Sequence, residues 1–560
     1  MSSFPTIQQI VLSENGNQDF TERDTITIMV DPAEIALLNG KDSYLRFTVK
    51  LDGDFKATLD RGGGGGHSII DTISIWNGDG STLLEQLNDV PVWMGAKNYY
   101  DNTEGLENQR NLLEGLQPYA GTLQSPYFKN SVLGEVDWTG VECCLPIYQS
   151  GILYGDSAFP VAATAGIMIK IQLADAKRAI VALQSAGFII DRTGAGGVMA
   201  ATGTVERNMP FLPTAVPLAG EGTAFTNLPQ CYEIGAAVAA GAATVGFSVR
   251  TTGAGLPTSA GLTPLLLRDN VNAPTVPADF PWIVGETCGY LDDAGLLVNC
   301  GPITAITSAP PLINVAFAAT TTTVATPANH CPCFVQIANT TQTASYIVSD
   351  VELVASVVQP DPRYFSAMMG AMKSGGGYSF DIRSFNLYRN NLMKNIAQSQ
   401  ELIPTTEFRA RGILMAQVDP TLAWNTSWCT PIQDYLRNYQ YVLGNVNTPL
   451  LAVVTDKEYD PGASSWNATA DEERLKALEA SKVTIRSELS PAGCFLTGRE
   501  VAKIGYSCNL NDIAVRYQQS WGVVDGVAGT VQPQKNKMLN TYIHHFRKIT
   551  CRPDNTQVQF

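Results

Sequence analysis

The sequence predicts an all-β protein in which two antiparallel sandwiches follow one another along the chain. Three observations support this class. Many short runs alternate between apolar and polar residues, as strands with one buried face require. Gly and Pro are abundant, with 49 and 31 of 560 residues, and they mark turns between the runs. A Pro- and Gly-containing stretch at 358–377 divides the runs into two sets, which predicts a linker between the sandwiches.

The composition suits a large folded protein and argues against nucleic-acid binding. Hydrophobic residues make up 45% of the chain and charged residues 16%, so the chain is too apolar for disorder. The 37 Lys and Arg against 52 Asp and Glu give a formal charge of −15, which repels a polyanion. No stretch concentrates basic residues. The sequence therefore predicts no sequence-specific nucleic-acid binding.

Targeting signals are missing from the sequence, and its cysteines are scattered. The first five residues lack the basic and apolar regions of a signal peptide, and the mild apolar run at 234–249 is diluted by Ala, Gly and Thr below a membrane span. Eleven cysteines, an odd number, lie between Cys143 and Cys551 without the dense spacing of a disulfide scaffold. We therefore expect a soluble protein made in a reducing compartment, with largely free thiols.

The stretch from 41 to 90 carries the strongest strand signal, with two alternating runs on either side of a glycine-rich loop. The predicted buried faces consist of Leu45, Phe47, Val49 and Leu51 in the first run and Ile69, Ile73 and Ile75 in the second. Asp71 is the one misfit in the second run, which stops at the turn cluster 77–80. Upstream, the runs at 4–13 and 25–30 predict two strands, or one bent strand, near a sheet edge.

The glycine run at 62–66 invites comparison with a phosphate-binding loop, whose backbone amides hold an anion ahead of a helix. When that motif is aligned on Gly66 and Ser68, Arg61 stands at its first glycine. His67 then stands at its lysine, and a strand follows where a helix belongs. This mismatch argues against a nucleotide site and favours a flexible turn.

The rest of the first half alternates strand signals with loops. The pattern at 103–116, which includes Leu106 and Leu116, predicts a short helix in a loop. Residues 141–147 begin another strand region, and the cleanest alternation of the chain lies at 167–173. From 183 to 343 the composition shifts to Ala, Gly, Thr and Pro with few charges, which predicts one long insertion with strands of its own.

The second half begins at the linker. A strand-like run at 346–354 precedes it, and the linker itself contains two prolines, a predicted short helix and three glycines. Strand signals resume at 378–383, 408–419, 438–444, 448–454, 494–507, 513–517, 541–550 and 557–560. One helix interrupts them, because Thr469 and Glu472 fit a capping box ahead of 474–482, whose charges predict a solvated face.

The spacing of His and Cys residues does not predict a metal centre. The His330–Cys333 segment is the one metal-like cluster, but a tetrahedral site needs a second pair, and Cys288 and Cys300 are not spaced as one. His544 and His545 are neighbours in a strand-like run, so their rings are expected to point to opposite faces.

Enzyme signatures are equally weak. The paired carboxylates Asp292–Asp293 and Glu472–Glu473 could serve acid–base chemistry, but neighbouring acidic residues are usually solvated charge. The 155–159 stretch lacks the second glycine of a nucleophile elbow, and four histidines offer few bases. Asn-x-Ser/Thr triplets, which mean little without a secretory signal, start at Asn339, Asn425 and Asn467. The sequence therefore predicts no catalytic, cofactor-binding or metal site.

Nine segments, taken in order, resemble one known family. They are YLRFTVKL at 44–51, the glycine loop at 62–66, IIDTISIWNGDG at 69–80, LLEQLNDV at 83–90, ECCLPI at 142–147, GILYGDSAFPV at 151–161, IMIKIQLADA at 167–176, YIVSDVELVASVV at 346–358 and YFSAMM at 364–369. This order resembles the double jelly-roll major capsid proteins of double-stranded DNA viruses, particularly those of polinton-like viruses and virophages. The departure is the insertion at 183–343, which is longer than jelly-roll loops need to be.

The resemblance implies two tandem eight-stranded antiparallel jelly rolls with helix-bearing loops. The first would span 1–360 with the insertion at about 183–343, the linker 361–377 and the second 378–560. In that family, loops at the position of the insertion form towers on the outer capsomer surface. The resemblance also implies a hexon-like, non-enzymatic structural protein that forms pseudo-hexameric homotrimers in the icosahedral capsid of a virion. Its expected partners are neighbouring capsomers and minor capsid and penton proteins, and it would assemble inside the host cell. The alternative on a β-sandwich is a carbohydrate-binding protein or glycoside hydrolase.

Overall fold

The computed structural model describes most of the two predicted strand sets and part of the insertion. The described residues are 6–101 (without 14–17, 54–56 and 61–62), 113–115, 128–129, 140–182, 232–249 (without 235–236 and 240), 284–317 (without 285–286, 292–296 and 310–311), 333–335, 343–454 (without 394–395, 419, 421–427, 430 and 432–435), 468–480, 496–521 (without 503–506) and 536–559 (without 554).

A first jelly roll contains eight antiparallel strands. They are β1 (Thr6–Leu12), β2 (Thr25–Val30), β3 (Leu37–Gly53), β5 (Ile70–Asn77), β6 (Leu83–Asn88), β8 (Val141–Leu145), β9 (Ile167–Leu173) and β17 (Ala344–Val358). One sheet has the order β1-β17-β3-β8 and the other the order β2-β9-β5-β6. This order places the last strand between the first and the third, which is the Greek-key arrangement of a jelly roll.

A second jelly roll repeats this order strand for strand. Its strands are β18 (Tyr378–Leu392), β19 (Gln398–Ile403), β20 (Ala410–Val418), β21 (Leu436–Leu443), β22 (Val446–Val454), β23 (Leu496–Glu500), β24 (Val515–Trp521) and β25 (Lys537–Arg552). The sheets are β18-β25-β20-β23 and β19-β24-β21-β22, and β26 (Asn555–Gln559) adds to β25. The all-β double jelly-roll fold expected from the sequence is therefore confirmed by the strand order.

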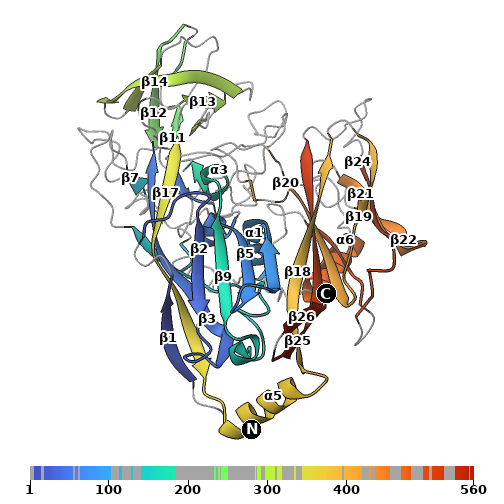
Figure 1. The fold of residues 1–560 in the computed structure, drawn as a ribbon. Helices are drawn as coiled ribbons and strands as arrows, with labels where there is room; N and C mark the ends of the chain where they lie inside the picture. Colours follow the sequence, from blue (N-terminus) through green and yellow to red (C-terminus); the bar gives the residue numbers. More distant parts are fainter. Residues whose placement is uncertain are drawn as a thin grey trace, which may run out of the picture.

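The remaining strands lie in loops of the first roll. β4 (Ala57–Leu59) pairs with β10 (Ile180–Ala182), and β7 (Phe128–Lys129) adds to β3. A six-stranded sheet in the order β11-β12-β15-β14-β13-β16 lies within 232–335. Its strands are β11 (Tyr232–Ile234), β12 (Thr244–Val249), β13 (Thr287–Leu291), β14 (Leu297–Ala309), β15 (Leu312–Phe317) and β16 (Cys333–Val335). Figure 1 shows this sheet at the end of the molecule opposite helix α5 (Pro362–Lys373).

The predicted alternation gives the correct buried faces. Leu45, Phe47, Val49 and Leu51 on β3 are each at most 3% exposed, and Ile73 and Ile75 on β5 are fully buried. The strand at 167–173 buries Ile167, Ile169, Ile171 and Leu173 in the same way. Asp71, the misfit in the pattern, has a structural explanation, since its carboxylate accepts a hydrogen bond from Arg178 at 2.5 Å.

Two sequence interpretations need correction. The glycine run was predicted to be a flexible turn, but Gly63 and Gly64 are buried and lead into the 3₁₀ helix η2 (Gly65–Ile69), whose residues are buried as well. A Cβ on Gly63 would lie 2.9 Å from the Cβ of Ser68 and 3.2 Å from Cys429 Sγ, so a side chain does not fit there. The second correction concerns α1 (Val90–Asp101), a helix that the sequence reading did not predict.

The predicted helix near Thr469 exists as α6 (Ala468–Ala480), but it begins before Thr469, which is therefore not its cap. Its face is not uniformly solvated. Glu473 and Arg474 are 8% and 4% exposed, and Glu473 forms an ion pair with Arg499. Burial against β23 and β20 is the reason, because α6 packs on both strands.

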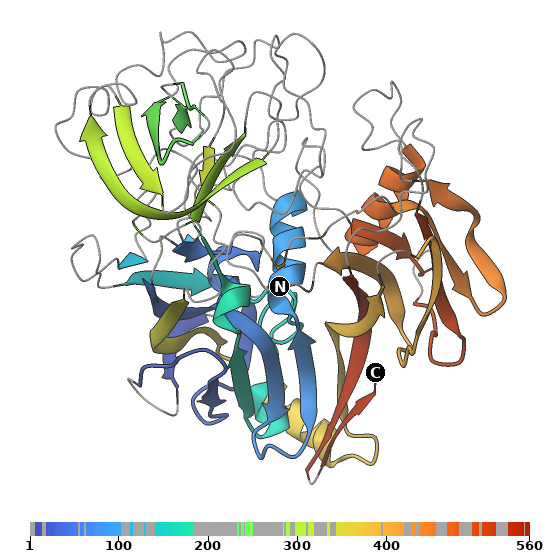
Figure 2. The same ribbon diagram turned by 90° about the horizontal axis from the view of Figure 1, so that it is seen from above.

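The two rolls lie side by side, with α1 between them (Figures 1 and 2). Helix α5 connects β17 to β18, and the side chain of Asp361 caps it by accepting a hydrogen bond from the Arg363 amide at 2.7 Å. The carboxylate thus satisfies one free amide of the first turn.

Candidate functional site at the interface of the two jelly rolls

Buried polar side chains and aromatic pairs gather where the two rolls meet, here called the inter-roll interface. Strand β6 and helix α1 of the first roll lie against β18, β20 and β25 of the second. Strand β20 is buried on both faces. Ile413 and Met415 join the second roll's own core, whereas Leu414 and Ala416 join the core of the first roll. One hydrophobic core therefore continues from the first roll across the interface.

Asp89 is the polar centre of this interface. It follows β6 directly, is fully buried, and adopts a left-handed backbone conformation with φ 50°. Its carboxylate forms ion pairs with Arg178 of the first roll, at 2.5 Å, and with Arg389 of the second. Asn540 donates a further hydrogen bond to it at 3.1 Å, and the Tyr542 hydroxyl donates one to the Asp89 carbonyl at 3.1 Å. One residue thus connects three groups of the second roll to the first.

Arg178 extends this cluster. Its guanidinium bridges Asp89 and Asp71, at 2.5 Å each, and lies 3.8 Å from the ring centre of Trp428 in the second roll. Burial opposes the charge, but the two carboxylates together hold the pKa of Arg178 above its ordinary value. The guanidinium therefore stays charged, and it contacts the second roll by a cation–π interaction.

A second buried ionic group lies along β6. The Glu85 carboxylate accepts hydrogen bonds from the Ser150 hydroxyl at 2.5 Å and the Gly151 amide at 2.9 Å. Burial raises the pKa of Glu85 despite these bonds and the nearby positive charge of Arg547. Arg547, on β25, donates to the Leu84 carbonyl at 3.1 Å and so connects the second roll to the backbone of β6.

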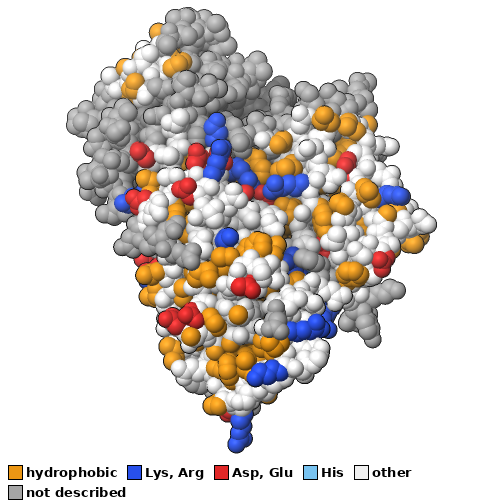
Figure 3. All heavy atoms as spheres, in the orientation of Figure 1, with side chains coloured by type: hydrophobic (Ala, Val, Ile, Leu, Met, Phe, Trp, Pro, Cys, Tyr) orange, Lys and Arg blue, Asp and Glu red, His pale blue; other side chains and the backbone are white. Residues whose placement is uncertain are grey.

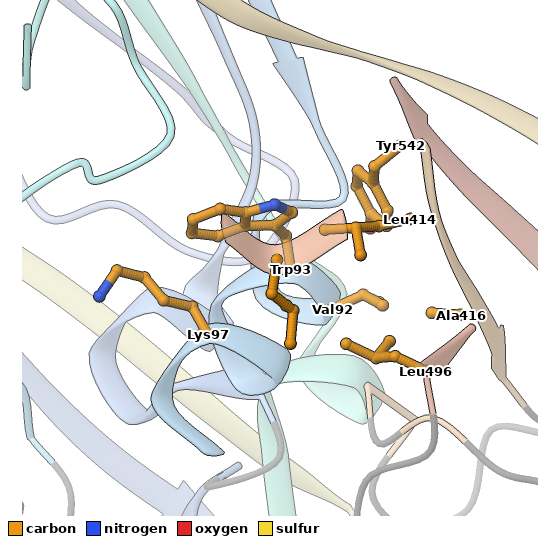
Figure 4. A pocket seen from close by; sticks show the side chains of 8 residues that line it. Val92, Trp93, Lys97, Leu414, Ala416, Leu496 and Tyr542 are labelled. Carbon is orange, nitrogen blue, oxygen red and sulfur yellow. The ribbon is translucent and has the colours of Figure 1, made fainter. Parts of the chain in front are cut away.

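Aromatic pairs fill the spaces between these polar groups. Trp93 of α1 meets Phe385 of β18 edge-on at 5.1 Å between ring centres, and Phe159 meets Phe380 at 5.4 Å. Beside Trp93 is a small cavity, shown in Figure 4. Its lining comes from both rolls and consists of Val92, Trp93, Lys97, Leu414, Ala416, Leu478, Leu496 and Tyr542. The Trp93 indole nitrogen is buried without a hydrogen-bond partner among the described residues.

The chemistry of this site is that of a structural contact. A raised carboxyl pKa, as in Glu85, suits a general acid, but Glu85 is fully buried and both of its oxygens are used within the interface. Among the described residues, no group of three or more His, Cys, Asp and Glu side chains could hold a metal ion. The geometry therefore offers rigid attachment of one roll to the other.

The residues weighed from the sequence as catalytic or metal-binding candidates do not converge. His544 packs on Phe385 at 5.0 Å between ring centres, whereas His545 bonds to the Ile543 carbonyl at 3.1 Å and accepts from Arg547 at 3.0 Å. The two rings thus have different partners, as adjacent strand positions predict. Glu472 pairs with Lys476 at 3.0 Å, whereas Glu473 pairs with Arg499.

Other candidates lie outside the described residues or side chains. These are Arg61, Asp292, Asp293, the His330–Cys331 pair, Asn339, Asn425, Asn467 and the side chains of Cys288, Cys300 and Cys333. The helix predicted at 103–116 is described at 113–115 alone. Among the described cysteines, Cys144, Cys429 and Cys551 carry free thiols. No helix among the described residues is long and apolar enough to cross a membrane.

The interface itself was not predicted from the sequence. Asp89, Arg178, Arg389 and Asn540 are separated by up to 451 residues, and no local motif relates them. The one available signal was Asp71, a charge on the otherwise apolar face of the predicted strand, but no partner was predicted for it.

Comparison with known proteins finds similarity at the level of solved structures. No protein-family model and no curated protein sequence matches the chain. The match to the Faustovirus major capsid protein covers 98% of this chain and 91% of the Faustovirus chain, at 7% sequence identity and a TM-score of 0.47. PBCV-1 VP54, fitted into a reconstruction of the virophage Sputnik, covers 100% and 98% at 6% identity and TM-score 0.45. The mavirus major capsid protein covers 99% and 90% at 8% identity and TM-score 0.36. These neighbours are capsid proteins of DNA viruses and virophages; the fold assignment itself rests on the strand order described above.

Proposed function

We propose that this chain is the major capsid protein of a double-stranded DNA virus, most like those of polinton-like viruses and virophages. It assembles as pseudo-hexameric homotrimers that tile an icosahedral shell around the genome. The protein is a component of the virion, is assembled inside the infected host cell, and has no catalytic activity. Its partners are other copies of itself and minor capsid and penton proteins.

The observation that carries the proposal is the pair of jelly rolls with one strand order, fixed side by side by the buried Asp89 cluster. A shell protein must have the same shape in every copy. A flexible hinge between the rolls would let their relative orientation vary from copy to copy. A buried ion pair is weak evidence for net stability. In this proposal the Asp89 cluster instead fixes one arrangement of the two rolls, which a repeating unit of a shell requires. In this proposal the titratable residues of the inter-roll interface hold the two rolls together.

We further propose that the rolls span 1–360 and 378–560, joined by 361–377. The insertion at about 183–343 forms a tower on the outer face of the capsomer. In support, its described strands lie at the opposite end from the α5 linker (Figure 1). Loop insertions between strands lie outside a sandwich core, where they can contact solvent or partners.

Electron microscopy of the purified protein tests the proposal. We expect compact particles of three chains with a six-cornered outline, or assembled shells. A glycan array run on the same sample addresses the carbohydrate-binding alternative. A monodisperse monomer that binds or cleaves glycans contradicts the capsid assignment, whereas trimers without glycan binding support it.

A further inference from the structure

Two edge strands at opposite flanks of the molecule are apolar and exposed. On β22, Leu450 and Leu451 are 83% and 79% exposed. On β1, Ile7 and Ile10 are 50% and 52% exposed. Each strand pairs on one side alone within the described chain, β22 with β21 and β1 with β17. In Figure 3, hydrophobic side chains lie along both flanks, near β22 at the right and β1 at the lower left. Such edges favour association with another chain.

The contact within the chain shows which strands fit one another. Counted along its own roll, β6 is the fifth strand of the first roll, and it lies against β18, the first strand of the second roll. Apolar side chains of both strands are buried, with Leu84 at 0% and Leu87 at 2% exposed on β6 and Ile382 at 6% and Phe385 at 8% exposed on β18. Within the chain, the fifth strand of one roll thus lies against the first strand of the other.

The two exposed edges are the same two positions. Strand β22 is the fifth strand of the second roll, and β1 is the first strand of the first roll. Within the chain, the fifth strand of the first roll therefore contacts the first strand of the second roll. The other fifth strand, β22, and the other first strand, β1, stay exposed at the flanks. We propose that β22 of one copy docks against β1 of the next copy, repeating between chains the contact that β6 and β18 make within a chain.

This inference rests on the proposed function and deepens it, since it names the surfaces through which copies meet. The contact is head-to-tail, because β22 and β1 are different surfaces on opposite flanks. Head-to-tail contacts form a closed ring when the rotation between copies closes. Three copies then give a ring of six rolls in which every junction is of the fifth-to-first kind.

Charge substitutions at the edges test the docking. One variant carries Leu450→Asp and Leu451→Asp on β22, and the other carries Ile7→Asp and Ile10→Asp on β1. The control carries Met393→Asp and Leu402→Asp, which are 63% and 57% exposed and lie on neither edge. By native mass spectrometry at micromolar concentration, we expect the trimer to be lost in both edge variants and kept in the control, with unchanged circular dichroism in all three.

Mixing the two edge variants distinguishes head-to-tail docking, of β22 against β1, from symmetric docking, of β22 against β22. A 1:1 mixture retains one intact junction, between β22 of one variant and β1 of the other, so we expect a heterodimer and no trimer. If β22 instead paired with β22 of another copy, the β1 variant alone would form dimers, which overturns the proposal. Trimers that survive both edge variants also overturn it while leaving the capsid assignment intact, whereas an unmodified protein that is monomeric contradicts the capsid assignment itself.

Cross-linking gives a second measurement that does not depend on disrupting the contact. A chain with Ile10→Cys and Leu451→Cys is treated with a short bismaleimide, and linked peptides are identified from a mixture of isotope-labelled and unlabelled copies. We expect links between positions 10 and 451 of different copies. Links of 10 to 10 or 451 to 451 in their place contradict the head-to-tail arrangement.

Discussion

At the scale of single residues, the interface depends most on the charge of Asp89. Its carboxylate is fully buried and faces two guanidiniums, Arg178 and Arg389. Replacing Asp89 by Asn keeps the shape and tolerates the left-handed backbone, but it leaves the buried positive charge of Arg178 compensated by Asp71 alone. Removing one partner of a buried ion pair costs about 3–5 kcal/mol. We therefore expect Asp89→Asn to lower the urea midpoint markedly.

Asp381→Asn is the matched control for this substitution. Asp381 pairs with Arg409 at 2.7 Å, but the side chains are 44% and 40% exposed, so the pair contributes about 0–1 kcal/mol at most. Equal shifts of the urea midpoint in the two variants would show that burial of Asp89 has no special role.

The two buried histidines predict a loss of stability toward acid pH. Burial, reinforced by nearby positive charge, lowers the pKa of His544 and of His545 from the ordinary 6.5 to about 3. Between these values the unfolded chain binds more protons than the folded one, so stability is present above about pH 6.5 and declines as the pH falls toward 3. In this window each histidine lowers the free energy of unfolding by up to about 1.4 kcal/mol for each pH unit of acidification.

Urea unfolding at about pH 7.5 and about pH 5.5 measures this slope. We expect a lower midpoint at the acid pH, and a smaller difference in His545→Gln, which can still accept the hydrogen bond from Arg547 Nε. A midpoint that does not change between the two pH values contradicts the assignment of neutral buried rings.

At the scale of elements, alternation in the sequence was enough to locate strands with one buried face, such as β3, β5 and β9. It fails for α1, whose sequence VPVWMGAKNYYD has no clear apolar stripe because the helix is covered from both rolls. It also fails for the glycine turn, where a Cβ on Gly63 would lie 2.9 Å from the Cβ of Ser68 and 3.2 Å from both Cys429 Sγ, in the other roll, and the Pro91 Cβ. Contacts with distant segments contribute to both features, and alternation within a short stretch of sequence does not report them.

Helix α1 is the element that we expect to couple the rolls. Trp93 is 5% exposed, packs on Phe385 and borders the existing cavity. Trp93→Ala enlarges that cavity and costs about 3–5 kcal/mol. Because the lost contacts are those between the rolls, we expect scanning calorimetry to resolve two transitions in this variant and a single one in the unmodified protein.

Trp76→Ala serves as the control, since Trp76 lies half-buried on β5, with Lys170 at 5.8 Å from its ring centre. It should keep a single transition. One transition in Trp93→Ala as well, merely shifted to lower temperature, would show that α1 stabilises the protein without coupling the two rolls.

At the scale of the whole molecule, the repeated strand order gives the chain two halves that are equivalent in topology but not in surroundings. The edges at the centre, β6 and β18, are covered, and the corresponding edges at the flanks, β22 and β1, are open. In the proposed trimer another copy covers these flanks, so the stability of the folded chain should depend on assembly.

The dependence of thermal unfolding on protein concentration tests this coupling. Obligate interfaces commonly bury more than about 2,000 Å², and chains that fold with such interfaces dissociate as they unfold. Mass action then raises the midpoint with concentration, because three unfolded chains would form from each proposed trimer. We expect the midpoint of the unmodified protein to rise over a hundredfold increase in concentration, and that of the Leu450→Asp, Leu451→Asp variant to stay constant. If the unmodified protein also shows a constant midpoint, dissociation precedes unfolding, and each chain is then stable without its neighbours.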